Sequence, residues 1–300
     1  MPNPIQLDPK FSTTRLAVTD KPLIALSPED KFEPLLFLSR NQTTENEGGL
    51  RSNGYFKKSY PEKPLISIIT VVYNGEKYLE ETIQSVINQT YDNVEYIIID
   101  GGSTDTTLEI IRKYDYAIDY WVSEKDHGLY HAMNKGLTLS TGDIIGMINA
   151  DDYYMPNVLE SIKDVYTAQN DRYFIIWGDI LKNDGIVKGW RPKKLKIGLF
   201  APHPSMFCTQ AVYKKIGLYR LWYKIASDYD FMYRAVNLHK IHPIYLPKTL
   251  VYFRDGGLSS QYIFRALTEE MLAKIENGEK AYKALSIYLL KLIKKYFKKA

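Results

Sequence analysis

The stretch PLISIITVVYNGEKYLEETIQSVINQTY, residues 64–91, decides the fold. Its opening part, residues 65–72, is apolar and β-branched almost throughout, which is typical of a strand buried on both faces of a sheet. After the polar segment YNGEKY, apolar residues recur at helical spacing from Leu79 to Ile87. The stretch therefore predicts a buried strand followed by a helix, which is the building unit of an α/β sheet.

This alternation continues through the first half of the chain. Further strands are predicted at residues 94–99, 118–122 and 144–148, and the helices between them include residues 108–111 and 129–137. Strands that alternate with short helices predict a mostly parallel sheet with helices on both faces. The second half is mixed, with strands expected at 173–177, 186–190 and 244–253, helices at 209–216 and 228–238, and a helical end from about residue 262.

Three parts of the chain differ in character. Residues 1–62 lack sustained periodicity and carry many turn formers, so we expect an irregular N-terminal arm that is partly ordered against the core. Residues 63–258 carry the strand–helix alternation and are expected to form the α/β domain. Residues 259–300 are expected to form a C-terminal helical extension.

Composition narrows the class of protein. Hydrophobic residues make up 45% and charged residues 25% of the chain, as in an ordinary globular protein. The net charge of +4 is too small to indicate nucleic acid as a partner. The single cysteine, Cys208, excludes an intramolecular disulfide and Cys-rich metal sites. No apolar stretch has the pattern of a secretory signal or the length to cross a bilayer, so we expect a cytoplasmic protein.

Polar and acidic residues follow four of the predicted strands. Since ligands bind at the carboxyl ends of the strands in open α/β sheets, these residues are candidates for a binding site. Carboxylates gathered there would repel each other, and a divalent metal, Mn²⁺ or Mg²⁺, holding a pyrophosphate would join them. The alternative is that each loop only caps the helix after it. The candidates are Tyr73, Asn74 and Glu76 after the first strand, Asp100 after the second, Asp126 after the third, and Asp151 and Asp152 after the fourth.

The pair Asp151 and Asp152 stands out because two adjacent carboxylates follow an apolar strand directly. Tyr153, Tyr154 and Pro156 come next, so the pair is expected at a walled edge of the sheet. Adjacent charges are costly in such a place without a partner. The pair is therefore the candidate for a metal site.

The motifs PLISIITVVYNGEKYLEETIQSVINQTY, YIIIDGGSTDTT and NADDYYMPN together resemble those of the family-2 glycosyltransferases, which have the GT-A fold. The resemblance covers roughly residues 63–258. It implies an inverting, metal-dependent enzyme that takes a sugar from a nucleotide-diphosphate sugar. The segment SEKDHGLYHAMNKG resembles a subgroup that makes bacterial surface polysaccharides, which implies a saccharide or lipid-linked saccharide acceptor.

The resemblance also implies roles for single residues. Asp152 would hold the metal on the diphosphate, and Asp151 would lie near the ribose or the metal. Asp126 and Asn134 would line the donor pocket. The first two loops would hold the nucleoside through Tyr73, Asn74, Glu76 and Asp100.

One position departs from the family pattern. Family members often carry two consecutive Asp at the end of the second strand, whereas this chain has Asp100 followed by Gly101. The resemblance implies a UDP-sugar as the donor. The missing carboxylate belongs to the part of the pattern that recognises the nucleotide base, so the motifs do not fix the base.

Inversion at the anomeric carbon needs a carboxylate that takes the proton from the acceptor hydroxyl as it attacks. The family usually supplies this base from an acidic pair at a helix start, and here Asp228 matches the base while Ser227 replaces the first acid. The alternative is that Ser227 and Asp228 merely cap the helix. Asp230 would orient that helix or bind the acceptor. By resemblance His203 would lie near the diphosphate or acceptor, with a structural hydrogen bond as the alternative. Arg254 stands beside a Gly-rich segment that either folds over the diphosphate or forms a plain turn.

Other functions fit the motifs less well. A nucleotidyltransferase usually has a Gly-rich basic loop after the first strand, and a Rossmann dehydrogenase needs G-x-G-x-x-G there, whereas this chain has YNGEKYL. A non-catalytic nucleotide-sugar-binding module is the alternative from a different class. Such a module would need no base, so Asp228 counts against it.

The C-terminal extension is basic, since no acidic residue follows Glu279. Two interpretations are open: the helix lies on an anionic membrane, or it packs its apolar face on the catalytic domain and leaves its lysines in water. A lipid-linked acceptor favours peripheral attachment to the inner face of the plasma membrane through residues from about 283 onward. The apolar face comprises Leu285, Leu289, Leu292, Ile293 and Tyr296, and the lysines are Lys283, Lys291, Lys294, Lys295, Lys298 and Lys299.

Overall fold

The computed structural model describes residues 4–24, 27–38, 46–189, 195, 198 and 202–299. Its strands are β1 (Glu47–Gly48), β2 (Ile66–Val72), β3 (Val94–Asp100), β4 (Tyr120–Ser123), β5 (Ile144–Asn149), β6 (Tyr153–Tyr154), β7 (Phe174–Lys182), β8 (Gly185–Val187), β9 (Met206–Thr209) and β10 (His242–Tyr252). They form one ten-stranded sheet of order β1-β4-β3-β2-β5-β9-β7-β10-β6, in which β8 pairs with β7.

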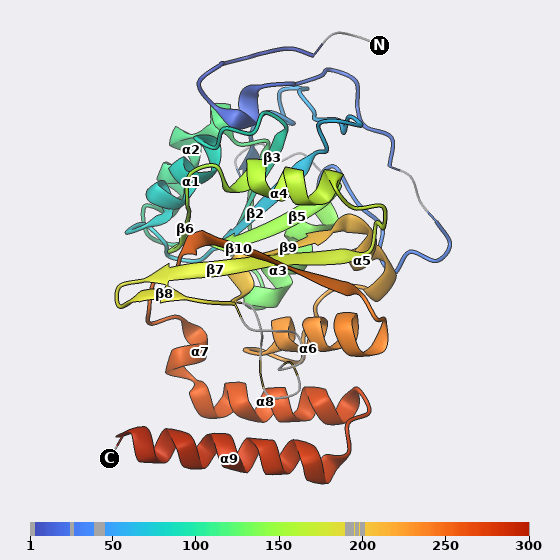
Figure 1. Cartoon of the computed structure of the whole chain (residues 1–300). Coiled ribbons are helices and arrows are strands. Elements are labelled where there is room, and N and C mark those ends of the chain that lie inside the picture. Colours follow the sequence, from blue (N-terminus) through green and yellow to red (C-terminus); the bar gives the residue numbers. More distant parts are fainter. Residues whose placement is uncertain are drawn as a thin grey trace.

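Helices lie on both faces of this sheet and at one end of the molecule (Figure 1). The α-helices are α1 (Leu79–Ile87), α2 (Thr107–Lys113), α3 (Leu129–Leu139), α4 (Val158–Thr167), α5 (Gln210–Ile216), α6 (Ser227–Tyr233), α7 (Leu258–Gln261), α8 (Ile263–Glu276) and α9 (Ala281–Lys299). Short 3₁₀ turns form η1 (Ser12–Thr14), η2 (Asp115–Ala117) and η4 (His203–Ser205), and a π-helical turn, η5 (Arg234–Leu238), continues α6.

The centre of the sheet is parallel, as the first half of the sequence predicts. Strands β4, β3, β2 and β5 pair in parallel, and Ile66 lies between Val94 and Ile144. The second half of the chain adds antiparallel pairs of β9 with β5 and with β7, so the sheet is mixed towards that edge. Strand β9 is not predicted from the sequence because four residues carry too little periodicity.

Both faces of the sheet are packed with apolar side chains. On one face α1, α2 and α4 cover the sheet through residues such as Ile83 and Ile162. On the other face α3, α5 and α6 cover it through Leu137, Val212 and Phe231. The prediction of helices on both faces is confirmed, and all seven residues of β2 are buried between the two layers.

The N-terminal arm is more regular than predicted. Strand β1 pairs antiparallel with β4 and so extends the sheet. The Arg51 guanidinium forms a buried ion pair with Glu95 at 2.5 Å, and the Thr13 hydroxyl donates to the Ala117 carbonyl at 2.6 Å. These contacts join residues far apart in the chain, so the pattern within residues 1–62 could not predict them.

The C-terminal helices stack on the face that α6 covers. Helix α8 packs on α6, and α9 packs back on α8 at the end of the molecule opposite the N-terminal arm (Figure 1). The helical end predicted from about residue 262 is thus divided near Gly278, whose φ of 90° is the left-handed conformation that favours glycine after a helix. None of the helices described combines the length and apolar character that a membrane crossing requires.

Candidate active site

The loops that follow β2 and β3 are bonded to each other at the carboxyl edge of the sheet. The Asn74 N–H donates to the Ser103 hydroxyl at 2.8 Å. The Glu76 carboxylate accepts from the Thr106 hydroxyl at 2.9 Å and from the N–H of the same residue at 3.2 Å. Two of the predicted nucleoside-binding residues therefore hold the loops together, whereas Tyr73 is 64% exposed and its ring is accessible.

Asp100 ends β3 and is completely buried. One carboxylate oxygen accepts from the Ser103 hydroxyl at 2.5 Å, and the other accepts from the Ser123 hydroxyl at 2.6 Å. Because both oxygens have partners, Asp100 fixes the loops after β3 and β4 to each other. The nucleoside contact expected of Asp100 stays a prediction.

The Asp126 carboxylate occupies the space beside Gly101. A Cβ placed on Gly101 would come within 2.6 Å of one Asp126 oxygen and within 3.5 Å of the Tyr73 ring. The other Asp126 oxygen accepts from the Gly128 N–H at 2.7 Å. The carboxylate that the sequence lacks at position 101 is therefore matched by one from the loop after β4, and the accessible Tyr73 ring also borders Gly101.

Asp151 and Asp152 have different surroundings. The Asp152 side chain is buried, and its carboxylate accepts from the Asn149 amide at 2.9 Å and the Arg254 N–H at 2.8 Å. Burial, together with the Asp151 charge, raises the pKa of Asp152 to about 7.

Asp151 is only partly buried, and burial raises the pKa of its carboxyl group. No other residue in the described part of the chain donates a hydrogen bond to its side chain. Asp151 therefore has the freer carboxylate, whereas the resemblance assigns the metal to Asp152.

Arg254 lies against the loop of the two aspartates. Its guanidinium donates to the Asp151 carbonyl and pairs with Glu81. The same group lies 4.2 Å from the Tyr78 ring centre and 5.5 Å from that of Tyr153. The Arg254 guanidinium thus brings a positive charge close to two aromatic rings and to the loop of the two aspartates, where an anionic ligand held by a metal ion would meet it.

The donor atoms at this edge suit a hard divalent cation. The described residues contain no group of three or more His, Cys, Asp or Glu side chains arranged around one point. Mg²⁺ and similar ions on nucleotides are usually held by one or two carboxylates and by phosphate oxygens, which is the set available here. A cation beside Asp151 would also offset the charge of Asp151, which adds to burial in raising the pKa of Asp152.

Asp228 lies in the first turn of α6 and is partly exposed. One carboxylate oxygen accepts from the Tyr130 hydroxyl at 3.0 Å and the Tyr229 N–H at 2.8 Å, and no other described residue donates to the second oxygen. Burial raises the pKa of Asp228 to about 6. The Ser227 hydroxyl donates to the Arg220 carbonyl and does not cap α6, whereas the Asp228 carboxylate accepts from an N–H of the first turn, so the capping alternative stays open for Asp228.

His203 and Asn134 meet at Tyr219. The His203 Nε2 lies 2.9 Å from the Tyr219 hydroxyl, and burial lowers the pKa of His203 to about 4, so the ring is neutral at pH 7. The Asn134 amide donates to the Tyr219 carbonyl at 2.8 Å and accepts from its N–H at 2.9 Å. Asn134 thus has a structural partner for each end of its amide. The donor contact expected of Asn134 gains no support from this arrangement.

The donor-side and base-side candidates lie at the same edge of the sheet. Strand β9 runs antiparallel to β5, so η4, which carries His203 and precedes β9, lies towards the end of β5 from which Asp151 follows. Helix α3 begins just after Asp126 and carries Tyr130, the partner of Asp228.

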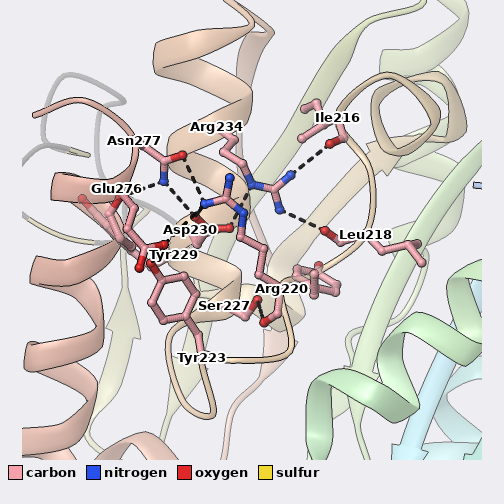
Figure 2. Close-up of polar contacts among 12 residues, drawn as sticks. Ile216, Leu218, Arg220, Tyr223, Ser227, Tyr229, Asp230, Arg234, Glu276 and Asn277 are labelled. Carbon is pink, nitrogen blue, oxygen red and sulfur yellow. Dashed lines mark hydrogen bonds and ion pairs between the residues drawn. The ribbon is translucent and has the colours of Figure 1, made fainter. Parts of the chain in front are cut away.

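Asp230 is held in a buried ion cluster (Figure 2). Its carboxylate pairs with Arg220 at 3.0 Å and with Arg234 at 2.9 Å, and it accepts from the Asn277 amide at 2.8 Å. These contacts fasten α6 to α8. They support the first of the two predicted roles of Asp230, that of orienting the helix, and leave its oxygens engaged.

Helix α8 also holds the loop before Asp228. The Glu269 carboxylate accepts from the N–H groups of Ile225 and Ala226 at 2.7 and 3.0 Å. The sequence analysis does not name Glu269 or Tyr130 as site residues. Glu269 follows no strand and stands in no motif, and the only signal for Tyr130 is its place in SEKDHGLYHAMNKG.

Comparison with known proteins settles the family. The model of "Glycosyl transferase family 2" matches residues 67–240, more than half of the chain, and the protein belongs to this family. An uncharacterised glycosyltransferase of Mycobacterium tuberculosis is 31% identical over 206 residues, which are 66% of this chain and 78% of the relative. A PGL/p-HBAD biosynthesis glycosyltransferase of Mycobacterium bovis is 26% identical over 208 residues, which are 67% and 81% of the two chains.

Solved structures agree with this assignment. S. aureus TarS 1-349 in complex with UDP-GlcNAc has a TM-score of 0.56 at 18% identity, over 75% of this chain and 70% of that one. The mannosyltransferase PcManGT from Pyrobaculum calidifontis, in complex with GDP-Man and Mn²⁺, has the same TM-score and identity, over 78% and 71%. At this identity the likeness concerns the fold, and the predicted GT-A fold is confirmed.

Proposed function

We propose that the protein is an inverting glycosyltransferase that moves a sugar from a nucleotide-diphosphate sugar, expected to be a UDP-sugar, to a saccharide or lipid-linked saccharide. Asp228 carries the proposal. It is a carboxylate at a helix start with one unengaged oxygen and a pKa raised to about 6. A non-catalytic nucleotide-sugar-binding module would need no such group.

The proposed reaction is a single displacement. The acceptor hydroxyl gives its proton to the Asp228 carboxylate while its oxygen attacks the anomeric carbon of the donor. The bond from that carbon to the diphosphate breaks, the nucleoside diphosphate leaves, and the configuration inverts. With a pKa of about 6, Asp228 is mostly ionised at pH 7 and still basic enough to take the proton. The Tyr130 hydroxyl, bonded to one oxygen, would keep the other turned to the acceptor.

Donor binding would fall to the loops after β2 to β5. The accessible Tyr73 ring beside the Asp126 carboxylate suits a nucleoside, and Arg254 suits the diphosphate. Asp151 would hold Mn²⁺ or Mg²⁺, and Asp152 would set the shape of the loop through its bond to the Arg254 N–H. A bound cation would neutralise charge on the departing diphosphate. The complex of PcManGT with GDP-Man and Mn²⁺ supports the use of a divalent metal.

The acceptor class rests on the motif SEKDHGLYHAMNKG and on the relatives. One relative is named for PGL/p-HBAD biosynthesis. On the motif we propose a role in surface polysaccharide synthesis, and a lipid-linked acceptor would place the reaction at the cytoplasmic face of the plasma membrane.

Release of nucleoside diphosphate tests the proposal. The protein is incubated with single nucleotide sugars, with and without Mn²⁺, and the released nucleoside diphosphate is measured. We expect Mn²⁺-dependent release from at least one UDP-sugar, and a transferred sugar whose anomeric configuration, read by NMR, is opposite to that of the donor. A nucleotide sugar that binds tightly but is never cleaved, with any acceptor, would favour the binding module. Retained configuration would remove Asp228 from the role of base.

A further inference from the structure

Helix α9 presents a stripe of apolar side chains to solvent. Leu285, Leu289 and Ile293 recur every four residues, so they lie on one side of the helix, and they are 47%, 48% and 53% exposed. Tyr282 and Leu290 border this stripe and are 63% and 66% exposed. We call these five residues the outer face of α9. Apolar residues gathered on a surface in this way mark a site of interaction.

The opposite side of α9 attaches the helix to the fold. Ala284 is completely buried, and the Tyr288 hydroxyl accepts from Thr268 of α8 at 3.4 Å. Lys291 pairs with Glu270 of α8 at 2.6 Å. Figure 1 shows α8 between α9 and the rest of the molecule. Packing on the fold therefore does not use the outer face.

The two interpretations of the C-terminal helix assume a single apolar face, and the structure divides that face between the packed side and solvent. The sequence analysis groups Leu292 with Leu285, Leu289 and Ile293, but Leu292 is partly buried and the other three are exposed. The interpretation in which the helix packs on the catalytic domain and leaves its lysines in water describes the structure in part, because α9 packs on α8 and Lys283, Lys294 and Lys295 are exposed. An apolar stripe is left in solvent, and Lys291 is used for packing.

The charge around the outer face has one sign. No acidic residue follows Glu279 in the chain. Lys283, Lys294 and Lys295 are exposed, and within the described residues no carboxylate forms an ion pair with them. Lys294 and Lys295 also line, with Lys291, an open groove between α8 and α9 whose apolar lining comes from Ile263 and Leu267. Lys295 stands one turn after Lys291, on the side of α9 that packs on α8, so Lys283 and Lys294 are the exposed lysines nearest the outer face.

We propose that the outer face of α9 is a docking surface for an anionic lipid bilayer. Apolar side chains enter the boundary between headgroups and acyl chains, and flanking lysines meet lipid phosphates, which is the geometry of a helix lying in the plane of a membrane. A second copy of the chain fits less well, because pairing two outer faces would bring two sets of unpaired lysines together. The proposal does not depend on the catalytic assignment.

Sedimentation of the full chain with vesicles tests this surface. Wild type is mixed with phosphatidylglycerol or phosphatidylcholine vesicles at low and high salt and compared with the variant L289Q/L290Q/I293Q. All three positions are exposed, so the fold should tolerate the changes. We expect binding to phosphatidylglycerol alone, weakened by salt, and a loss of at least about 30-fold in the variant, since affinity follows the buried apolar area.

Two further variants make the test specific. The control L23Q/L238Q changes exposed leucines elsewhere, which are 98% and 49% exposed, and should bind vesicles as wild type does. The variant K283Q/K294Q, which changes the exposed lysines nearest the outer face, should bind more weakly and lose part of the salt dependence.

Three outcomes would overturn the proposal. The wild type does not bind phosphatidylglycerol vesicles, the triple variant binds them as well as wild type does, or the wild type is a stable dimer in solution and the triple variant is a monomer. Donor cleavage in solution by the triple variant shows that it is folded. A wild type that binds vesicles but cleaves no donor would contradict the enzyme assignment and leave the docking surface standing.

Discussion

The loops after β2 and β3 and the start of α6 are held by different parts of the chain. On the donor side the loops after β2 and β3 bond each other, as between Asn74 and Ser103, which are 29 positions apart. On the base side Glu269 and Asn277 of α8 hold the start of α6 from 43 to 47 positions further along the chain. The family match ends at residue 240, so these two residues lie outside it.

This difference suggests that the two sides affect different steps, binding of the donor on one side and the chemical step on the other. The loops after β2 to β5 lie within the region that the family model matches, whereas Arg254 on the donor side and helix α8, which holds the start of α6, both follow it. Changes on the donor side should therefore alter metal and nucleotide binding. Changes on the base side should alter the rate and leave binding intact.

The largest effect is expected at the base. Asp228→Asn keeps the shape of the side chain but cannot take a proton, so kcat should fall at least about 100-fold while the affinity for nucleoside diphosphate stays within about twofold. Steady-state kinetics and calorimetric titration measure the two quantities. Asp164→Asn, on the exposed side of α4, is the matched control and should change neither. A near-normal kcat in Asp228→Asn would contradict the role of Asp228 as the base, and with it the expectation that base-side changes alter the rate.

On the donor side, substitutions of Asp151 and Asp152 should have different effects. Asp151→Asn removes the freer carboxylate, so Mn²⁺-dependent binding of UDP should weaken by roughly 10-fold or more while the thermal midpoint stays the same. Asp152→Asn turns an amide towards the Asn149 amide, which should cost about 1–3 kcal/mol of the free energy of unfolding. If Asp152→Asn instead loses the Mn²⁺ dependence at unchanged stability, the metal belongs to Asp152, as the resemblance implies.

A smaller effect is expected from Glu269→Gln. The neutral amide is a weaker acceptor for the N–H groups of Ile225 and Ala226, so the loop before Asp228 should lose part of its order and kcat should fall about 3- to 10-fold. KM for the donor should not change. Glu279→Gln is the control, since Glu279 accepts from Tyr233 and does not touch this loop. A rise in donor KM without a fall in kcat would contradict a positioning role.

The smallest effect is a shift of the pH profile. Burial raises the pKa of Asp228 to about 6, so kcat should fall as the pH drops through 6 and the base becomes protonated. The Tyr130 hydroxyl opposes this rise, and Tyr130→Phe should therefore move the acidic limb of the kcat profile to higher pH. An unmoved limb would show that another group controls it.

The same pKa shift makes the free energy of unfolding fall over the pH range in which kcat rises. Folded Asp228 binds its proton more tightly than the unfolded chain, whose carboxyl has the ordinary value of 3.8. The contribution of Asp228 to the free energy of unfolding should therefore decline as the pH rises from about 4 to 6.

Much of the fold could be predicted because its central strands are continuous apolar runs. The strand predicted at 65–72 is observed as Ile66–Val72, and the strand predicted at 94–99 is observed as Val94–Asp100. The order of the N-terminal arm could not be predicted, because it comes from distant partners such as Glu95, which pairs with Arg51. A periodicity argument sees only neighbours along the chain.

The candidate site was predictable in position more than in detail. Adjacent acids after a strand pointed to Asp151 and Asp152, but which carboxylate is engaged depends on Arg254, about a hundred residues later. Asp230 and Asn134 carry polar groups that look available in a sequence. In the structure, buried partners occupy them.

The shared space of Gly101 and Asp126 has a consequence for how the chain can vary. Aspartate at position 101 would place its Cβ within 2.6 Å of an Asp126 oxygen, and Asp126 is tied through its other oxygen to the Gly128 N–H. The effect of Gly101→Asp is therefore expected to depend on what stands at position 126, so the two positions should be changed together in engineering. Any exchange of donor loops with a family member that carries a second aspartate there must move both loops together.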